Sequence, residues 1–200
     1  MSQLLKQWGK ILLIGVVLMQ LIACEKAELN YLDEISAGQT AGIGIKYSGI
    51  LSDTLFFDYP SSSASRLIDL NDDGIDDFEL KFSGSASPGH GNSKNFIIPF
   101  GSNALAIPNL ENDIVDTLSL NDKIDSSINW INDSCTIYNY YWDASGSTSR
   151  TGLWNNVKNK YIGLKILVDN KVLYGWIRIE VTFGWNLTLI DYASTVGYEN

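Results

Sequence analysis

Candidate oxygen ligands occupy alternate positions in one short segment of the sequence, DLNDDGIDDFEL at residues 69–80. The candidate ligands at its positions 1, 3, 5, 7 and 9 are Asp69, Asn71, Asp73, the backbone carbonyl of Ile75, and Asp77. Calcium takes about six to eight oxygen ligands, and a glycine at position 6 allows the sharp turn that gathers them around one point. The spacing therefore predicts a calcium site. Magnesium ranks second because it demands stricter octahedral geometry.

The segment resembles two known calcium loops, those of the EF-hand and of FG-GAP repeats. It departs from the EF-hand at position 12, where Leu80 replaces the bidentate glutamate, and its flanks RLIDL and DFELKF have strand-like patterns. The FG-GAP loop, with aspartate at position 9 between strands, is the better match. A single copy does not imply a propeller. The alternative is a solvated acidic turn, because Asp, Asn and Gly are also the usual turn residues.

The sequence begins with a different signal. Lys6 and Lys10 precede an apolar run at residues 11–23, which stops at Cys24. This run is too short to span a membrane, and the arrangement is the pattern of a signal peptide. The residues LIAC at 21–24 resemble the bacterial lipobox. By that resemblance the signal peptide, residues 1–23, is cleaved, and Cys24 is lipidated and anchors the chain to a membrane. The residues after Cys24 are not the aspartate linked to inner-membrane retention, which favours the outer membrane of a Gram-negative bacterium.

The remaining chain must position the acidic loop, and its patterns are those of strands. Phe78, Leu80 and Phe82 alternate with charged residues, and apolar residues alternate again in YIGLKILV and VLYGWIRIEV, which the turn Asp169-Asn170-Lys171 joins. A hairpin is expected across residues 43–59. Residues 120–131 are ambiguous, because Ile124, Ile128 and Ile131 have helical spacing whereas the residues at 125–127, DSS, are poor helix formers. About ten short strands predict an all-β fold, a jelly-roll-like β-sandwich at residues 42–200 that follows a tether at 24–41.

Roughly the last quarter to third of the chain resembles the C-terminal module of secreted bacterial β-rich proteins without an assigned function. The residues that carry this resemblance are KYIGLKILVDNKVLYGWIRIEV and LTLIDYA. The resemblance implies an extracytoplasmic β-fold and supplies no catalytic residue.

Aromatic residues offer a second candidate site. Tyr141, Trp142 and Trp154 are the candidates for stacking against sugar rings, although alternation would also place Tyr138, Tyr140 and Trp142 in a core. Cys135 is expected to be a small buried hydrophobic residue, and His90, in a glycine-rich loop, receives no role.

The composition narrows the functional classes. The chain is 45% hydrophobic and 18% charged, as globular proteins are, and its net charge of −9 disfavours nucleic acid as a partner. We expect a membrane-anchored lipoprotein of the cell envelope, a calcium-binding β-sandwich with a binding or structural role and no enzymatic activity. Its partners would be the membrane and a glycan or an envelope protein. The alternative is a surface protein that binds or degrades polysaccharide.

Overall fold

A computed structural model describes residues 29–56, 58–109, 113–182 and 185–198. The predicted signal peptide and the lipidation site Cys24 lie outside these residues, so both stay predictions. Within the described ranges every regular element is a strand, fourteen in all. None of these residues forms a helix long and apolar enough to cross a membrane. The predicted all-β sandwich is confirmed, with more strands than the expected ten.

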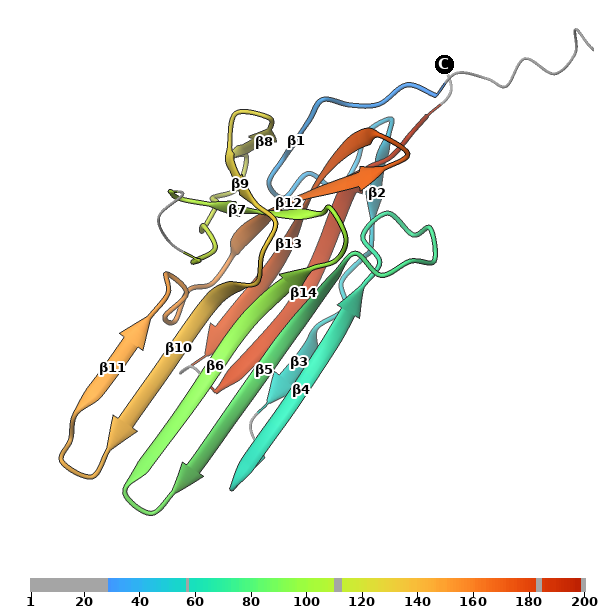
Figure 1. Cartoon of the computed structure of the whole chain (residues 1–200). Coiled ribbons are helices and arrows are strands. Elements are labelled where there is room, and N and C mark those ends of the chain that lie inside the picture. Colours follow the sequence, from blue (N-terminus) through green and yellow to red (C-terminus); the bar gives the residue numbers. More distant parts are fainter. Residues whose placement is uncertain (1–28, 57, 110–112, 183–184, 199–200) are drawn as a thin grey trace, which may run out of the picture. The chain divides into compact units, whose positions relative to one another are not determined.

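One sheet has five antiparallel strands in the order β11-β10-β6-β5-β4 (Figure 1). Their bounds are β4 (Ser61–Ile68), β5 (Phe78–Ser87), β6 (His90–Pro99), β10 (Cys135–Asp143) and β11 (Thr148–Thr151). Strands β4, β5 and β6 form a meander, because each pairs with the next strand in the sequence. The predicted alternation of Phe78, Leu80 and Phe82 is confirmed, since all three are fully buried.

The other sheet has seven strands, with the order β2-β14-β13-β12-β7-β9 and β3 also paired to β14. Their bounds are β2 (Ile45–Tyr47), β3 (Asp53–Phe56), β7 (Ala104–Ile107), β9 (Asn129–Ile131), β12 (Lys160–Val168), β13 (Lys171–Thr182) and β14 (Asn186–Thr195). The predicted hairpin across residues 43–59 is wrong. Both β2 and β3 pair with β14 rather than with each other, because residues 48–52 loop out and let the chain continue along the same edge.

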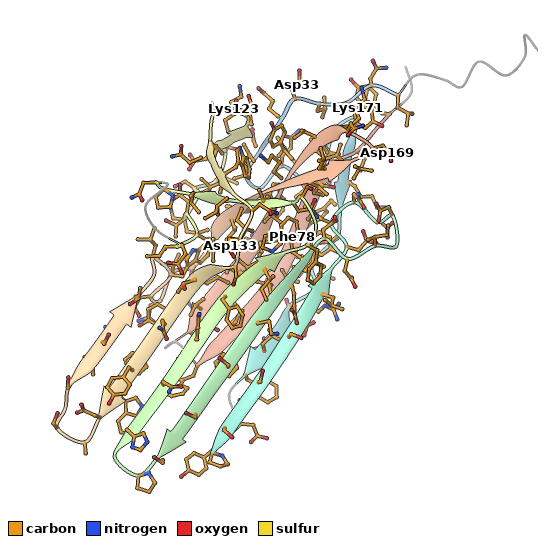
Figure 2. All side chains as sticks on the ribbon, viewed as in Figure 1. Asp33, Phe78, Lys123, Asp133, Asp169 and Lys171 are labelled. Atoms are coloured by element: carbon orange, nitrogen blue, oxygen red, sulfur yellow. The ribbon has the colours of Figure 1, made fainter. Side chains whose placement is uncertain are left out.

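The turn between β12 and β13 is as predicted. Val168 pairs with Lys171, which leaves Asp169 and Asn170 as a two-residue loop, and both have positive φ, 48° and 63°. Figure 2 labels Asp169 and Lys171 at this turn. Asp and Asn tolerate this left-handed conformation, which gives the twist that an antiparallel hairpin needs.

Residues near the start of the described chain form a further strand. β1 (Glu34–Ser36) pairs with β8 (Lys123–Asp125), and Ile35 is 1% exposed. This part of the range 24–41 therefore belongs to the β-structure rather than to a tether, because its apolar side chain is needed in a core. The ambiguous segment 120–131 contains β8 and β9, so strand pairing overrides its helical spacing.

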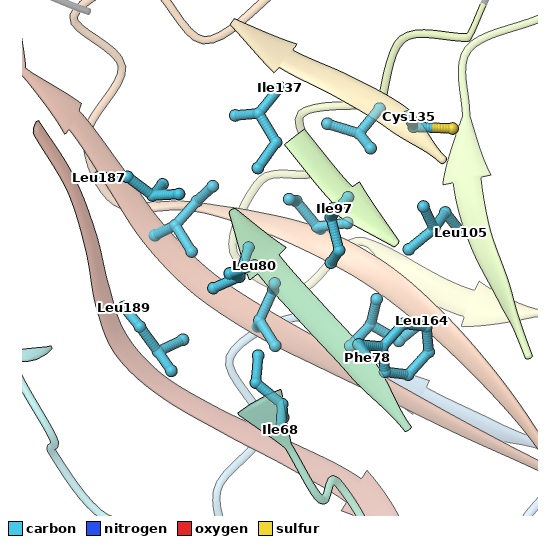
Figure 3. Packing of buried hydrophobic residues seen from close by; sticks show 14 of the residues in the cluster. Ile68, Phe78, Leu80, Ile97, Leu105, Cys135, Ile137, Leu164, Leu187 and Leu189 are labelled. Carbon is cyan, nitrogen blue, oxygen red and sulfur yellow. The ribbon is translucent and has the colours of Figure 1, made fainter. Parts of the chain in front are cut away.

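The main core lies between the two larger sheets (Figure 3). Ile68, Phe78, Leu80 and Ile97 from the five-stranded sheet pack with side chains of the seven-stranded sheet, among them Leu105, Leu164, Leu187 and Leu189. A second core covers the opposite face of the seven-stranded sheet and contains Ile35, Leu118, Ile124, Tyr161, Tyr174 and Trp176. β12 and β13 are therefore buried on both faces, which explains their nearly continuous apolar sequences.

Candidate functional site

The Asp-rich loop connects β4 to β5 and is folded around the carboxylate of Asp69. That carboxylate accepts hydrogen bonds from three backbone N–H groups, those of Asp72 at 2.7 Å, Asp73 at 3.1 Å and Gly74 at 2.7 Å. Gly74 has φ +87°, the conformation for which glycine was expected at the sixth position. The predicted sharp reversal is thus present, and it is stabilised by the first predicted ligand.

Asn71 and Asp73 lie side by side in the same turn. The Asn71 Nδ2 donates to Asp73 Oδ2 at 3.0 Å, and the Asn71 Oδ1 accepts from the Asp73 N–H at 3.0 Å. Asp73 Oδ1 in turn accepts from the N–H of Ile75 at 2.9 Å. The structure therefore brings three of the predicted side-chain ligands, Asp69, Asn71 and Asp73, into one solvent-facing turn.

Asp77, the predicted ligand at position 9, turns into the protein and is 5% exposed. Its Oδ2 accepts from the Leu70 N–H at 2.9 Å, and its Oδ1 accepts from Nδ2 of Asn103 at 3.1 Å. Burial raises the pKa of the Asp77 carboxyl, these two hydrogen bonds oppose the rise, and the charges of Asp73 and Asp69 add to it. Asp77 thus ties the loop to the connection between β6 and β7.

A cavity of about 320 Å³ lies beside the loop. Asp73, Asp76 and Asp77 from the loop line it together with Asn103 and with Asp169 of the β12–β13 turn. All of these side chains offer oxygen atoms, the donors that a hard cation prefers. Within the described ranges, however, no three His, Cys, Asp or Glu side chains converge as a group that could hold a metal ion. The chemistry of the donors fits calcium, and their present spacing does not close around one ion.

The three aromatic residues predicted to stack against sugars do not form one surface. Tyr141 is 42% exposed and lies on the opposite face of β10 from Tyr140 and Trp142. Trp154 is fully buried in the core between the sheets, so no ligand can reach its ring. The competing expectation of burial is confirmed for Tyr138, at 1% exposure.

Trp142 covers a glycine on the neighbouring strand. It pairs with Gly91, where an added Cβ would lie 2.5 Å from Trp142 Nε1. The indole therefore fills the space that a side chain at position 91 would occupy, which gives Trp142 a packing role in the sheet.

Sequence reasoning missed a second cavity, of about 190 Å³. Its lining residues are Tyr138, Tyr140, Arg150, Asn155, Asn156 and Trp185. They come from β10, from β11, from the connection between β11 and β12, and from the segment before β14. No local motif joins them, so only the folded chain reveals the site.

The residues that carry the C-terminal resemblance form an aromatic contact and an ion pair within the seven-stranded sheet. Tyr161 packs edge-on against Trp176 with ring centroids 5.2 Å apart, and Arg178 forms a two-point ion pair with the buried Asp191. The hydroxyl of Tyr47 donates to the same carboxylate at 2.8 Å. These contacts join β2, β12, β13 and β14.

The other two residues considered in the sequence, Cys135 and His90, both lie in described strands. Cys135 is fully buried, as predicted, and is a free thiol. His90 is exposed at the start of β6, where its ring contacts the hydroxyl of Ser87.

No protein-family model matches the chain, and neither the curated proteins nor the solved structures include a significant match. The class of protein is therefore defined by its fold alone, a β-sandwich with an Asp-rich loop between two strands of one sheet.

Proposed function

We propose that this chain is a lipid-anchored protein of the cell envelope, with a binding or structural role rather than an enzymatic one. The observation that carries the proposal is the lipobox-like LIAC at residues 21–24 after a short apolar run. Acyl chains on Cys24 would hold the protein at the outer membrane, each buried methylene contributing about 0.8 kcal/mol.

Metabolic labelling with a palmitate analogue tests the anchor. The full chain expressed in a Gram-negative host should incorporate the label and fractionate with the outer membrane. Cys24→Ala should lose both properties. Cys135→Ala is the matched control, because it removes the other cysteine and should leave labelling intact. Unlabelled protein, or labelling that survives Cys24→Ala, contradicts the proposal.

The proposal includes calcium binding at the Asp-rich loop, through Asp69, Asn71, Asp73, the Ile75 carbonyl and Asp77. It is supported by the shared turn of the first three side chains and by the mutual repulsion of Asp69, Asp73 and Asp77. A cation at the turn would offset that repulsion. The loop joins two paired strands, so the ion would stabilise the β4–β5 connection instead of opening a pair of helices as in sensor EF-hands.

Thermal unfolding with calcium and then with chelator tests the ion. A ligand that binds only the folded state adds about 2.7 kcal/mol at a hundredfold excess over Kd, and each kcal/mol raises Tm by roughly 2–4 °C in a chain of this size. Asp73→Ala should abolish the difference. The exposed Asp58, outside the loop, provides the control Asp58→Ala. Equal Tm values in calcium and chelator contradict calcium binding.

A further inference from the structure

The second cavity lies at the border of the two larger sheets and draws residues from both. Tyr138 and Tyr140 belong to β10, and Arg150 to the edge strand β11 of the five-stranded sheet (Figure 1). Trp185 comes from the turn between β13 and β14 of the seven-stranded sheet. Asn155 and Asn156 come from the connection that leads from one sheet to the other. The site therefore exists only when the sandwich is assembled.

Its walls have a defined geometry. Arg150 pairs directly with Tyr140 across the two strands, and its guanidinium carbon lies 5.5 Å from the centre of the Tyr140 ring. Trp185 meets the same ring edge-on, with centroids 6.1 Å apart and planes at 87°. Stacking on Tyr140 restricts the guanidinium, and the aromatic contact holds the Tyr140 ring in turn. The cavity thus combines a positioned cation with aromatic walls.

The charge of the site is opposite to that of the protein. None of the lining residues is acidic, and within the described part of the chain Arg150 forms no ion pair with a carboxylate. The chain as a whole carries a net charge of −9. Burial raises the pKa of Tyr138, so its hydroxyl stays neutral. Because its guanidinium lies against Tyr140 in a cavity lined by no carboxylate, Arg150 is placed to receive an anionic ligand.

We propose that this cavity binds a hexuronate, the carboxylated sugar residue of an acidic polysaccharide. The Arg150 guanidinium matches a carboxylate with two parallel hydrogen bonds. The amide of Asn155 supplies both a donor and an acceptor for neighbouring sugar hydroxyls, and the Tyr140 and Trp185 rings offer apolar faces or edges to the C–H groups of a pyranose. The volume is below the roughly 300 Å³ of pockets for drug-sized ligands, which suits one sugar ring.

The site goes beyond the proposed anchor and calcium loop and depends on neither. Its lining includes none of the three aromatic residues, Tyr141, Trp142 and Trp154, that the sequence predicted to stack against sugars. A phosphate would be the other anion for an arginine, but the site presents one cation among aromatic and amide side chains. That composition favours a single carboxylate attached to a ring over a multiply charged phosphate.

Isothermal titration of the purified full chain tests the proposal. The probes are oligomers of galacturonate, glucuronate and mannuronate, with neutral oligomers of galactose, glucose and mannose as their matched counterparts. At least one hexuronate should bind, about tenfold or more tightly than its neutral counterpart, because a hydrogen-bonded charge pair is worth roughly that factor or more. Equal affinity for the acidic and neutral forms, or no binding of any hexuronate, overturns the proposal.

Variants locate the binding to this cavity. Arg150→Met should weaken hexuronate binding by about tenfold or more, and Arg150→Lys should recover only part of the loss because it lacks the planar fork. Tyr141→Ala, on the opposite face of β10, and Lys94→Met, an exposed cation on β6, should change nothing. Unfolding curves confirm that each variant is folded. Wild-type affinity in Arg150→Met, or displacement of the sugar by inorganic phosphate at equal concentration, overturns the proposal.

Discussion

The side chains of Asp77 and Asn103 form a polar bridge between the two larger sheets. Nδ2 of Asn103 donates to Asp77 Oδ1 at 3.1 Å, and Oδ1 of Asn103 accepts from the backbone N–H of Leu167 in β12 at 3.0 Å. Both side chains are nearly fully buried. A single asparagine therefore connects the end of the Asp-rich loop with a central strand of the opposite sheet.

Replacing Asn103 with alanine should destabilise the domain. The change leaves a buried carboxylate oxygen and a backbone N–H without their partners, and each such group costs about 1–3 kcal/mol. Urea unfolding followed by tryptophan fluorescence measures the loss. The control is Asn92→Ala, because Asn92 is exposed on β6 and should change stability by less than about 0.5 kcal/mol. Equal stability of the two variants would show that the bridge contributes nothing.

The ion pair of Arg178 and Asp191 predicts a larger effect. Asp191 is 1% exposed, so Arg178→Met leaves a buried charge with only the Tyr47 hydroxyl as its remaining side-chain partner among the described residues. Such a loss costs about 3–5 kcal/mol, whereas replacing both partners with apolar residues costs much less. Unfolding of Arg178→Met and of Arg178→Met/Asp191→Leu compares the two cases.

A surface pair provides the control for that experiment. Arg66 and Asp53 lie 3.3 Å apart with side chains 49% and 40% exposed, and such pairs contribute about 0–1 kcal/mol. Arg66→Met should therefore have little effect. If Arg178→Met were equally mild, the buried pair would not hold β13 and β14 together as described.

A side chain at position 175 should clash with its neighbours in the seven-stranded sheet. An added Cβ would lie 2.7 Å from the Ala193 carbonyl oxygen and 2.7 Å from Leu70 Cδ2, so Gly175→Ala should cost about 1–3 kcal/mol. At Gly163 the nearest atoms are Ala106 Cβ at 3.0 Å and Leu118 Cδ1 at 3.1 Å, farther away than the atoms at Gly175, so a smaller shift makes room for the new methyl group. Thermal unfolding should rank Gly175→Ala below Gly163→Ala, and the reverse order would contradict this account.

The thiol of Cys135 should be unreactive in the folded protein. Burial raises the pKa of its thiol to about 12, and the nearby charges of Asp113 and Asp133 act in the same direction. In a Cys24→Ser chain, where Cys135 is the only thiol, a disulfide reagent at pH 8 should react only after urea is added, because the thiolate is the reactive form. Rapid reaction without urea would show that the site opens readily.

The same thiol predicts a pH dependence with a definite sign. Because its pKa is raised from 9.0 to about 12 in the folded protein, its stabilising effect is complete below pH 9 and is lost between about pH 9 and 12. Burial also raises the pKa of several tyrosines, so the total alkaline loss has more than one source. Cys135→Ala should therefore lose less stability than the parent chain between pH 8 and pH 11, measured by urea unfolding.

Local chemistry was sufficient to predict several features from the sequence. Asp169 and Asn170 adopt left-handed conformations, which these residue types tolerate, so the β12–β13 turn follows from two residues. Alternation placed Phe78, Leu80 and Phe82 in a core because every second side chain of a strand points to the same face. The reversal at Gly74 follows from the missing Cβ. In each case the determining contacts lie within a few residues.

Other features depend on partners far along the chain, and only the tertiary structure decided them. β2 and β3 pair with β14 instead of each other, Trp154 enters the core, and Asp77 turns inward because Asn103 offers it a hydrogen bond. The cavity around Arg150 likewise needs both sheets in place. The Asp-rich loop shows both contributions. The sequence determines the spacing of its carboxylates, whereas long-range packing determines that Asp77 is buried while Asp73 faces solvent.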